Sequence, residues 1–173
     1  MINPIYKNAA IMKQMQDYFK KSKVIKLNNF FQNPKSVVNN IKFKRKYLPI
    51  EYSYEESNVI KINKKELTNF LSSFFKINKI TISLKTYSHE DYSLLNDLPQ
   101  RNKAEFIIDL TKKWNKNAGG YTSFIQNNKE ILRIYPEHNT LTLINTKNST
   151  KSFVKYVNCL SKNKRTVIEG TIF

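Results

Sequence analysis

Three neighbouring residues, His89, Glu90 and Asp91, form a His-x-Asp pattern in a polar stretch that follows alternating apolar residues. An imidazole and a carboxylate are common ligands of iron and other divalent metals, so His89 and Asp91 are candidate metal ligands. The single cysteine, Cys159, is a candidate third ligand as a thiolate. The alternative interpretation is a solvated histidine at a strand end and a cysteine that packs as a small hydrophobe.

The elements that would position these residues are short strands, because the apolar residues alternate with polar ones from Lys79 onward. Seven or eight strands are expected, separated by polar or Gly-rich stretches. Their apolar markers are Ile80/Ile82/Leu84, Phe106–Ile108, Phe124, Ile131/Ile134, Leu141/Leu143, Val154/Val157 and Val167.

The N-terminal half is predicted to supply two or three helices and two strands. A helix is expected from Asn3-Pro4 to about Lys21, packed outside the domain or, alternatively, bound to a membrane surface or a partner. Further expected elements are a strand at 24–27, a helix from Asn33-Pro34, a loop with extended pieces at 43–57, a strand at 59–62, and a helix capped by Asn63 with Glu66 at its third position.

Helices followed by many short strands predict an α+β, mainly β fold: a jelly roll, or double-stranded β-helix, backed by N-terminal helices. The 173 residues are 40% hydrophobic, which is enough for one domain over 1–173, with residues 1–22 as the outer helix. No apolar run is long enough for a membrane span, and one cysteine fits a reducing compartment. The expected location is cytoplasmic.

The net charge of +17 makes nucleic acid or a ribonucleoprotein a candidate partner. The excess comes from 26 lysines against four arginines, whereas phosphate-binding surfaces favour the arginine fork. Asparagine and isoleucine are also abundant, at 22 and 19, which is typical of the codon bias of an AT-rich genome. The charge therefore has a compositional interpretation beside the functional one, and the macromolecular partner stays unknown.

The order of these signals resembles the prolyl-hydroxylase branch of the 2-oxoglutarate and iron(II) dioxygenases. The matching features are the strand and turn at 24–31 (VIKLNNFF), Tyr87, the buried strand at 106–110, Trp114 followed by Gly119-Gly120, the Pro/Asn-x-Leu strand at 136–143, the Val-rich strand at 153–158, and Arg165. The resemblance covers about 150 residues. It implies 2-oxoglutarate and Fe(II) as cofactors if the protein is active.

The resemblance also implies a position for the cosubstrate. Arg165 opens the last expected strand, where the family anchors 2-oxoglutarate through a guanidinium–carboxylate fork. Tyr87 is placed to donate its hydroxyl to the same carboxylate. The alternative interpretations are a solvated arginine at a strand edge and a tyrosine ring that packs in the core.

The family's iron ligands are where this sequence departs from the pattern. A facial iron site needs two imidazoles and a carboxylate. The register puts the first histidine at Asn96, the carboxylate at Leu98 and the second histidine near Ser152 or Cys159, and none of these is a good iron ligand. The His89–Asp91 pattern lies seven residues upstream of Asn96, so only a shifted strand could present it.

Two functions are compatible with this sequence. The first is a degenerate oxygenase fold, a pseudoenzyme retained as a non-catalytic binding or scaffolding module, which the replaced ligands favour. The alternative is an active hydroxylase of a protein, saccharide or nucleic-acid substrate. Whether the protein is an enzyme is left open, because a fold does not determine a function.

Overall fold

The computed structural model describes residues 1–57, 59–94, 104–146 and 150–173. These residues form three α-helices, two 3-10 helices and eleven strands. The helices are η1 (Pro4–Lys7), α1 (Ala9–Ser22), α2 (Pro34–Val38), α3 (Lys64–Ser72) and η2 (Lys116–Ala118). The strands are β1 (Val24–Asn28), β2 (Lys44–Leu48), β3 (Tyr52–Ser57), β4 (Ile80–Tyr87), β5 (Tyr92–Ser93), β6 (Ala104–Asp109), β7 (Thr122–Gln126), β8 (Lys129–Ile134), β9 (Thr140–Ile144), β10 (Thr150–Val154) and β11 (Arg165–Ile172).

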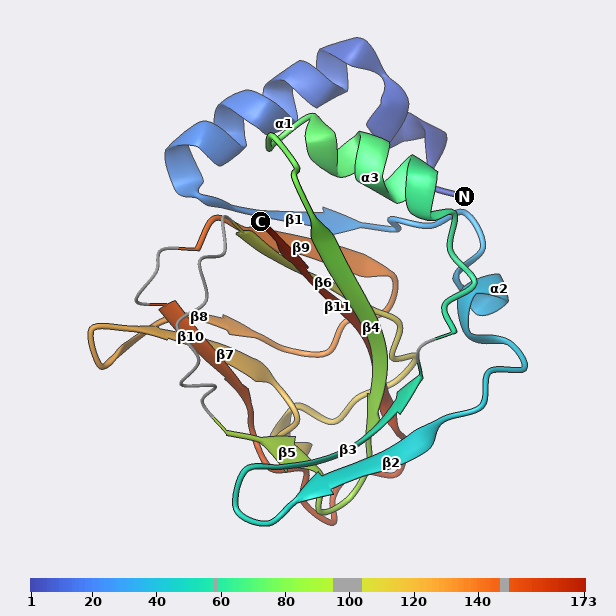
Figure 1. Ribbon diagram of the computed structural model, residues 1–173, viewed down its shortest axis with the longest axis vertical. Helices are drawn as coiled ribbons and strands as arrows, with labels where there is room; N and C mark the ends of the chain where they lie inside the picture. The colour runs from blue at the N-terminus through green and yellow to red at the C-terminus, as the bar shows by residue number, and fades with distance from the viewer. Residues whose placement is uncertain (58, 95–103, 147–149) are drawn as a thin grey trace.

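The strands form one curled antiparallel sheet in the order β1-β9-β6-β11-β4-β3-β5-β10-β7-β8, with β2 paired to β3. Strand β3 pairs with both β4 and β5 and so joins two halves. We call β1-β9-β6-β11-β4 the covered half and β5-β10-β7-β8 the second half (Figure 1). This curled sheet confirms the predicted jelly roll.

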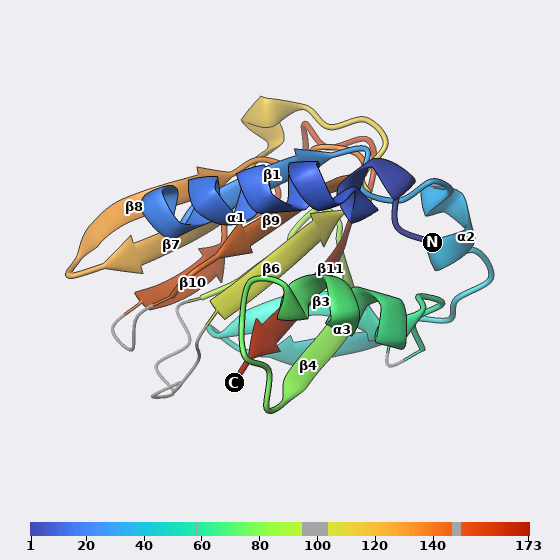
Figure 2. The ribbon, with the colours of Figure 1, turned by 90° about the horizontal axis from the view of Figure 1, so that it is seen from above.

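Side-chain alternation along the strands builds a core on each face of the covered half. On β6, Phe106 and Ile108 join the cluster that contains α1 and α3 residues, whereas Ile107 joins a cluster with Phe124 of the second half. Figure 2 shows α1 and α3 lying over the covered half. The predicted helical backing is confirmed, and the inner face carries the second apolar cluster together with the polar residues of the site.

The N-terminal helix differs from its prediction at Asn8. Residues Pro4–Lys7 form a 3-10 turn, and α1 begins only at Ala9. The Asn8 backbone is extended, and its side chain accepts hydrogen bonds from Ala10 N and Ile11 N. Asparagine is a strong N-cap, so it starts a new helix where a continuous one was predicted. None of the helices in the described ranges is long and apolar enough to cross a membrane.

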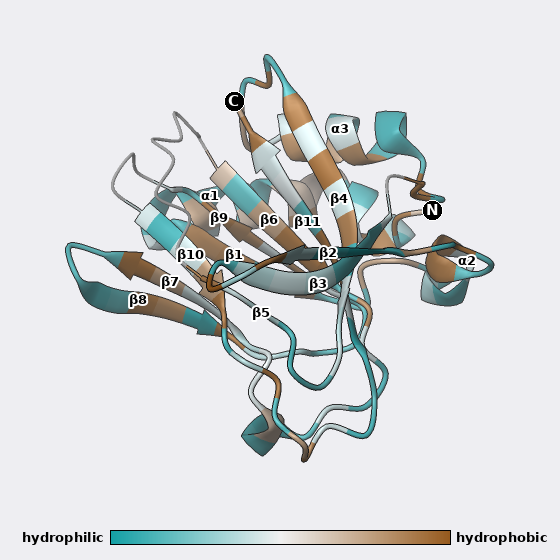
Figure 3. Ribbon diagram, turned by 60° about the horizontal axis from the view of Figure 1, so that its bottom comes forward, coloured by the Kyte–Doolittle hydropathy of each residue, from teal (hydrophilic) through white to brown (hydrophobic). Residues whose placement is uncertain are grey.

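The segment 43–57, predicted as a loop with extended pieces, forms the paired β2–β3 hairpin. All five residues of β2 are exposed, so the strand lacks the apolar alternation that identifies strands in a sequence. Conversely, the strand predicted at Val59, Ile60 and Ile62 has no strand pairing among the residues described there. The hairpin joins the two halves through β3 and runs in front of other strands of the sheet in Figure 3.

The two shorter helices behave differently. Helix α3 is capped as predicted, because the Asn63 side chain accepts a hydrogen bond from Glu66 N. Helix α2 spans only five residues, and the Asn33 side chain makes no capping hydrogen bond. Asn33 therefore occupies the N-cap position before Pro34, where the helix was predicted to begin, without a side-chain capping bond.

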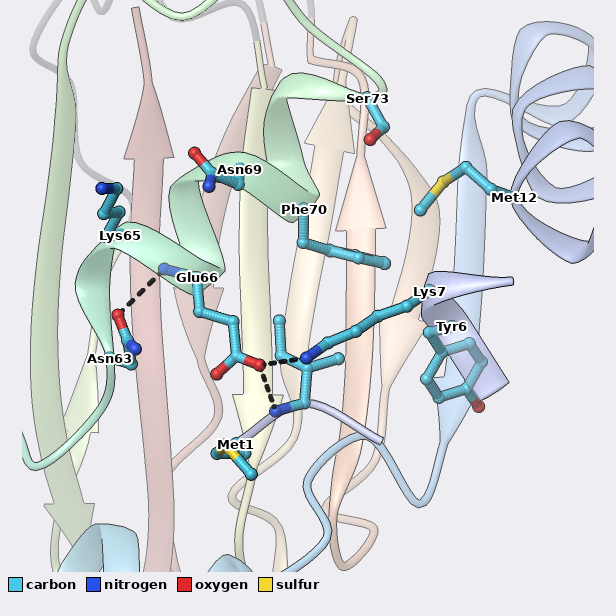
Figure 4. A pocket seen from close by; sticks show the side chains of 11 residues that line it. Met1, Tyr6, Lys7, Met12, Asn63, Lys65, Glu66, Asn69, Phe70 and Ser73 are labelled. Atoms are coloured by element: carbon cyan, nitrogen blue, oxygen red, sulfur yellow. Dashed lines mark hydrogen bonds and ion pairs between the residues drawn. The ribbon is translucent and has the colours of Figure 1, made fainter. Parts of the chain in front are cut away.

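Helix α3 also holds the N-terminal segment through one carboxylate. Glu66 Oε1 lies 2.7 Å from Lys7 Nζ and accepts a hydrogen bond from Ile2 N at 3.3 Å (Figure 4). A hollow of about 450 Å³ lies beside this contact, lined mainly by Met1, Tyr6, Met12, Phe70 and Ser73. The ion pair therefore fixes the first residues to the face of α3.

Candidate functional site

Arg165, the first residue of β11, is the largest fully buried side chain of the described residues. Its Nε donates to Asp109 Oδ2 at 3.0 Å, and its Nη1 donates to Thr122 Oγ1 at 2.9 Å. The Asp109 bond lies within the covered half, and the Thr122 bond crosses to β7 in the second half. The guanidinium therefore links the two halves from inside the fold.

Asp109, the last residue of β6, uses both carboxylate oxygens. Oδ2 accepts from Arg165 Nε, and Oδ1 accepts from the backbone N of Thr111 at 2.9 Å. Burial raises the pKa of the Asp109 carboxyl, and Arg165 and Thr111 oppose that rise by stabilising the ionised form. Because each oxygen accepts a hydrogen bond from a nitrogen, the geometry suits a carboxylate.

Tyr87, the last residue of β4, lies directly opposite Arg165 in the β4–β11 register. The Arg165 guanidinium carbon is 6.0 Å from the centre of the Tyr87 ring, and the Tyr54 ring packs 5.7 Å from it. Tyr87 Oη and Arg165 Nη2 are buried and have no hydrogen-bond partner among the described residues. Burial also raises the pKa of the Tyr87 hydroxyl, so this group stays a neutral donor.

One step further along the same strands lies a second charged pair. Lys85 Nζ is 2.9 Å from Glu169 Oε2 and 4.7 Å from the centre of the Tyr54 ring. Burial opposes the charge of both groups, but their attraction raises the pKa of Lys85 and lowers that of Glu169. Both groups are therefore held in their charged forms.

This second pair lines a cavity of about 900 Å³ between the two halves. Glu105, Ser152, Ile50 and Leu94 are among the other residues that line it. Such a concave, partly apolar hollow at the mouth of a jelly roll is where a ligand or a partner side chain can bind.

The candidate metal ligands His89 and Asp91 lie in the turn between β4 and β5. Asp91 is fully buried, and its Oδ1 contacts Ser53 Oγ at 2.8 Å and Arg45 Nη2 at 2.6 Å. Its Oδ2 accepts from Ser88 N at 2.8 Å and from Ser88 Oγ at 2.9 Å. A carboxylate has about four acceptor positions, so protein donors already occupy those of Asp91.

The His89 side chain differs from that of Asp91 in its surroundings. It is exposed, and its ring lies 6.5 Å from that of Tyr156. Cys159 is also exposed. Over the described ranges, no group of three or more His, Cys, Asp or Glu side chains is arranged to hold a metal ion.

The family register positions are divided between the described and undescribed parts of the chain. Asn96 and Leu98 lie outside the described residues. Ser152, on β10, is half-buried in the cavity wall, 3.5 Å from Glu105 Oε2. On this side of the site the described donor set is a hydroxyl and a carboxylate, which does not fit a facial iron centre.

Trp114 and the two glycines after it form a structural corner. Trp114 Nε1 donates to Gly119 O at 3.0 Å, and its ring packs so closely on Gly120 that a Cβ there would lie 2.6 Å from it. Gly119 and Gly120 both have positive φ angles, 74° and 63°. Trp114 is followed by the glycine pair, as the sequence analysis noted. The contacts of these three residues are structural ones.

Sequence reasoning identified Arg165 and Tyr87 but missed their partners Asp109 and Thr122, as well as Lys85 and Glu169. Residues 106–109 read as one buried run, although a charged residue closes it. The usable signal was the alternation along β11, where Arg165, Val167 and Glu169 share one face.

Comparisons with known proteins agree on one family. A sequence model described as "Oxoglutarate and iron-dependent oxygenase degradation C-term" matches residues 56–172. Prolyl 3-hydroxylase OGFOD1 of Xenopus laevis is 33% identical over 97 residues, which are 51% of this chain and 19% of that protein. The mouse protein of the same name is 33% identical over 82 residues, 43% of this chain and 14% of that protein. The chain thus matches less than a fifth of the length of these curated relatives.

Solved structures show the same fold. A prolyl hydroxylase from Trichoplax adhaerens, solved with a hypoxia inducible factor oxygen degradation domain peptide, has a TM-score of 0.72 at 16% identity, covering 98% of this chain and 91% of that chain. A Pseudomonas putida prolyl-4-hydroxylase has a TM-score of 0.67 at 9% identity, covering 93% and 97%.

Proposed function

Because the chain belongs to the family described as "Oxoglutarate and iron-dependent oxygenase degradation C-term", we propose that it is a prolyl-hydroxylase-like fold with a degenerate metal site. In this proposal it acts as a non-catalytic binding or scaffolding module. Membership confirms the resemblance to the prolyl-hydroxylase branch. The observation that carries the proposal is the bonding of Asp91, the carboxylate of the only His-x-Asp pattern in the sequence.

A metal-binding carboxylate must offer an oxygen lone pair to the ion. The Asp91 oxygens instead receive donors from Ser53, Ser88 and Arg45. Releasing one oxygen to iron would leave buried donors without partners, at a cost of about 1–3 kcal/mol each. Asp91 therefore supports the turn before β5 and the β2–β3 hairpin.

The residues at the family register point the same way. Asn96 and Leu98 replace an imidazole and a carboxylate in the sequence, and Ser152 or Cys159 replaces the second imidazole. An amide, an alkyl group and a hydroxyl or single thiol do not supply the charge or the nitrogen donors of a facial iron site.

The second candidate function is an active hydroxylase of a protein, saccharide or nucleic-acid substrate. It is favoured by Arg165 Nη2 and Tyr87 Oη, two buried donors on adjacent strands. In that case Arg165 and Tyr87 would hold 2-oxoglutarate, and His89 with Asp91 would hold iron. Bound iron and 2-oxoglutarate would supply the oxidising chemistry.

The test is to measure iron content and succinate formation from 2-oxoglutarate in the natural protein, in His89→Ala and in His138→Ala. His138 is the matched control, because it is a histidine outside the His-x-Asp pattern. Its ring contacts Leu110 O at 3.1 Å. We expect no stoichiometric iron and no turnover above background in all three proteins. Turnover that His89→Ala abolishes and His138→Ala retains would establish the hydroxylase instead.

We further propose a macromolecular partner in the cytoplasm as the ligand of this module. Two residues that line the cavity support a docking role, because Ile50 and Leu94 are large apolar side chains exposed at 80% and 51%. Isolated apolar residues are common on surfaces, but here they line a concave site.

A further inference from the structure

In the jelly roll described above, Arg165 already has a carboxylate partner that the chain supplies. Asp109 Oδ2 lies 3.0 Å from Arg165 Nε, and both side chains are at most 3% exposed. We propose that Asp109 is a built-in carboxylate ligand of Arg165 that takes the place of a dissociable oxo-acid. The position that would bind a cosubstrate is, in this chain, a fixed internal ion pair.

The contacts of Asp109 make it a permanent ligand. Its second oxygen is tied to Thr111 N, so the carboxylate is fixed at both ends of its acceptor group. Asp109 and Arg165 lie on the adjacent strands β6 and β11, whose register pairs Val167 with Asp109. Strand pairing therefore places the two side chains on adjacent strands, within reach of the 3.0 Å contact between Arg165 Nε and Asp109 Oδ2.

The charge balance excludes a second carboxylate at the same guanidinium. Arg165 carries one positive charge at any accessible pH, and Asp109 neutralises it. An added carboxylate would leave a net negative charge in a site where Arg165 is fully buried. Desolvating an uncompensated charge is strongly unfavourable, so an oxo-acid gains little from Arg165 while Asp109 is present.

The remaining donors do not change this balance. Arg165 Nη2 and Tyr87 Oη are the two hydrogen-bonding groups left over, and Tyr87 is held neutral. They suit a neutral acceptor, since the ion pair beside them has no net charge. Thr122, which accepts a hydrogen bond from Arg165 Nη1, is also among the residues that line the cavity.

The first experiment is calorimetric titration of the natural protein with 2-oxoglutarate, without metal and with Fe(II) under anaerobic conditions. We expect no binding at millimolar 2-oxoglutarate. Binding would overturn the assigned role of Asp109. Although this role rests on the proposed non-catalytic function, the two fail separately: binding without turnover contradicts Asp109 alone, whereas turnover contradicts the function.

The second experiment removes the internal carboxylate with Asp109→Ala and restores one from solution. We expect the melting temperature to fall by roughly 10 °C, because the Arg165 charge is left buried and unpaired. Formate or acetate at 100 mM should recover at least a third of this loss, with chloride at equal ionic strength as the reference. Asp109→Gly, which leaves the same space for an added carboxylate, serves the same measurement if the alanine variant does not fold.

The matched control is Asp91→Ala, which also removes a fully buried carboxylate paired with an arginine. Its partner Arg45 is half exposed and keeps its water, so we expect no specific recovery with formate. Recovery of Asp91→Ala to the same extent, or a normal melting temperature for Asp109→Ala, would contradict the proposal.

Discussion

At the scale of single residues, the Lys85–Glu169 pair is the clearest stability determinant of the cavity. The two side chains are only 18% and 22% exposed and 2.9 Å apart. Replacing Lys85 by Met leaves the Glu169 carboxylate with its largest compensating charge removed. We expect Lys85→Met to lower the free energy of unfolding by about 3 kcal/mol, as measured by urea denaturation.

Two controls isolate the cause of that loss. The double variant Lys85→Met/Glu169→Leu removes both charges and should regain most of the stability, because apolar replacements of a buried pair are often neutral. Lys26→Met breaks a pair that is about half exposed and should cost less than about 1 kcal/mol. A loss below 1 kcal/mol in Lys85→Met itself would show that water reaches Glu169 freely.

The same scale shows how far the site could be predicted. Arg165 and Tyr87 were identified, and the register places them directly opposite each other. Their binding role stays a prediction. Asp109 was missed because its partner is 56 residues away in sequence, and only the strand register determines which inner-face residues meet. Asp91 had a local signal for a metal ligand, yet serine and arginine donors from the folded chain use its oxygens.

At the scale of elements, the docking of the N-terminal segment on α3 is expected to depend on pH. Lys7 lowers the pKa of the Glu66 carboxyl, chiefly through its hydrogen bond, and Ile2 N adds to this effect. A carboxylate whose folded pKa is below its unfolded value stabilises the fold above that unfolded value, and the contribution is lost as pH falls through the folded pKa. The contact is therefore present at pH 7 and weakens below the ordinary value of 4.5.

Hydrogen exchange of the amides of residues 1–8 measures this contact directly. We expect Glu66→Gln to lower their protection factors at pH 7 by roughly five-fold, which is about 1 kcal/mol, and to remove most of the further loss of protection that the natural protein shows at pH 3.5. Glu137→Gln, which breaks an exposed pair with Lys26, is the control and should leave these amides unchanged. Equal protection in Glu66→Gln would mean that the apolar hollow alone holds the segment.

The elements that the sequence predicted are those whose buried apolar residues recur at a regular spacing. Helix α3 and most strands from β4 onward carry apolar periodicity and were predicted, whereas the two-residue strand β5 was not. The β2–β3 hairpin was missed because β2 is exposed throughout and is specified by its pairing with β3. The break at Asn8 shows the opposite case, since a local cap overrode a continuous helical pattern.

At the scale of the whole molecule, the positively charged residues differ in their surroundings: some form ion pairs and others lie on an exposed strand. The chain has 30 lysines and arginines against 13 acidic residues. Several cations are bound to carboxylates, among them Lys7, Lys26, Lys85 and Lys164. Strand β2 is different: Lys44 and Lys46 lie on a fully exposed edge strand, on either side of Arg45.

Nucleic-acid binding, if it occurs, should be purely electrostatic, because lysine is a point charge without the geometry to read a base or grip one phosphate in two places. We expect a 20-nucleotide single-stranded RNA to bind at 50 mM KCl with the same affinity as a strand of scrambled sequence. The logarithm of the association constant should fall against the logarithm of the salt concentration with a slope of about −0.7 per contacted phosphate.

The double variant Lys44→Ala/Lys46→Ala should make that slope shallower by about 1.4. Lys26→Ala removes a charge that is paired with Glu137 and should change the slope less. No binding at low salt would remove nucleic acid as a partner and leave the lysines as a feature of composition.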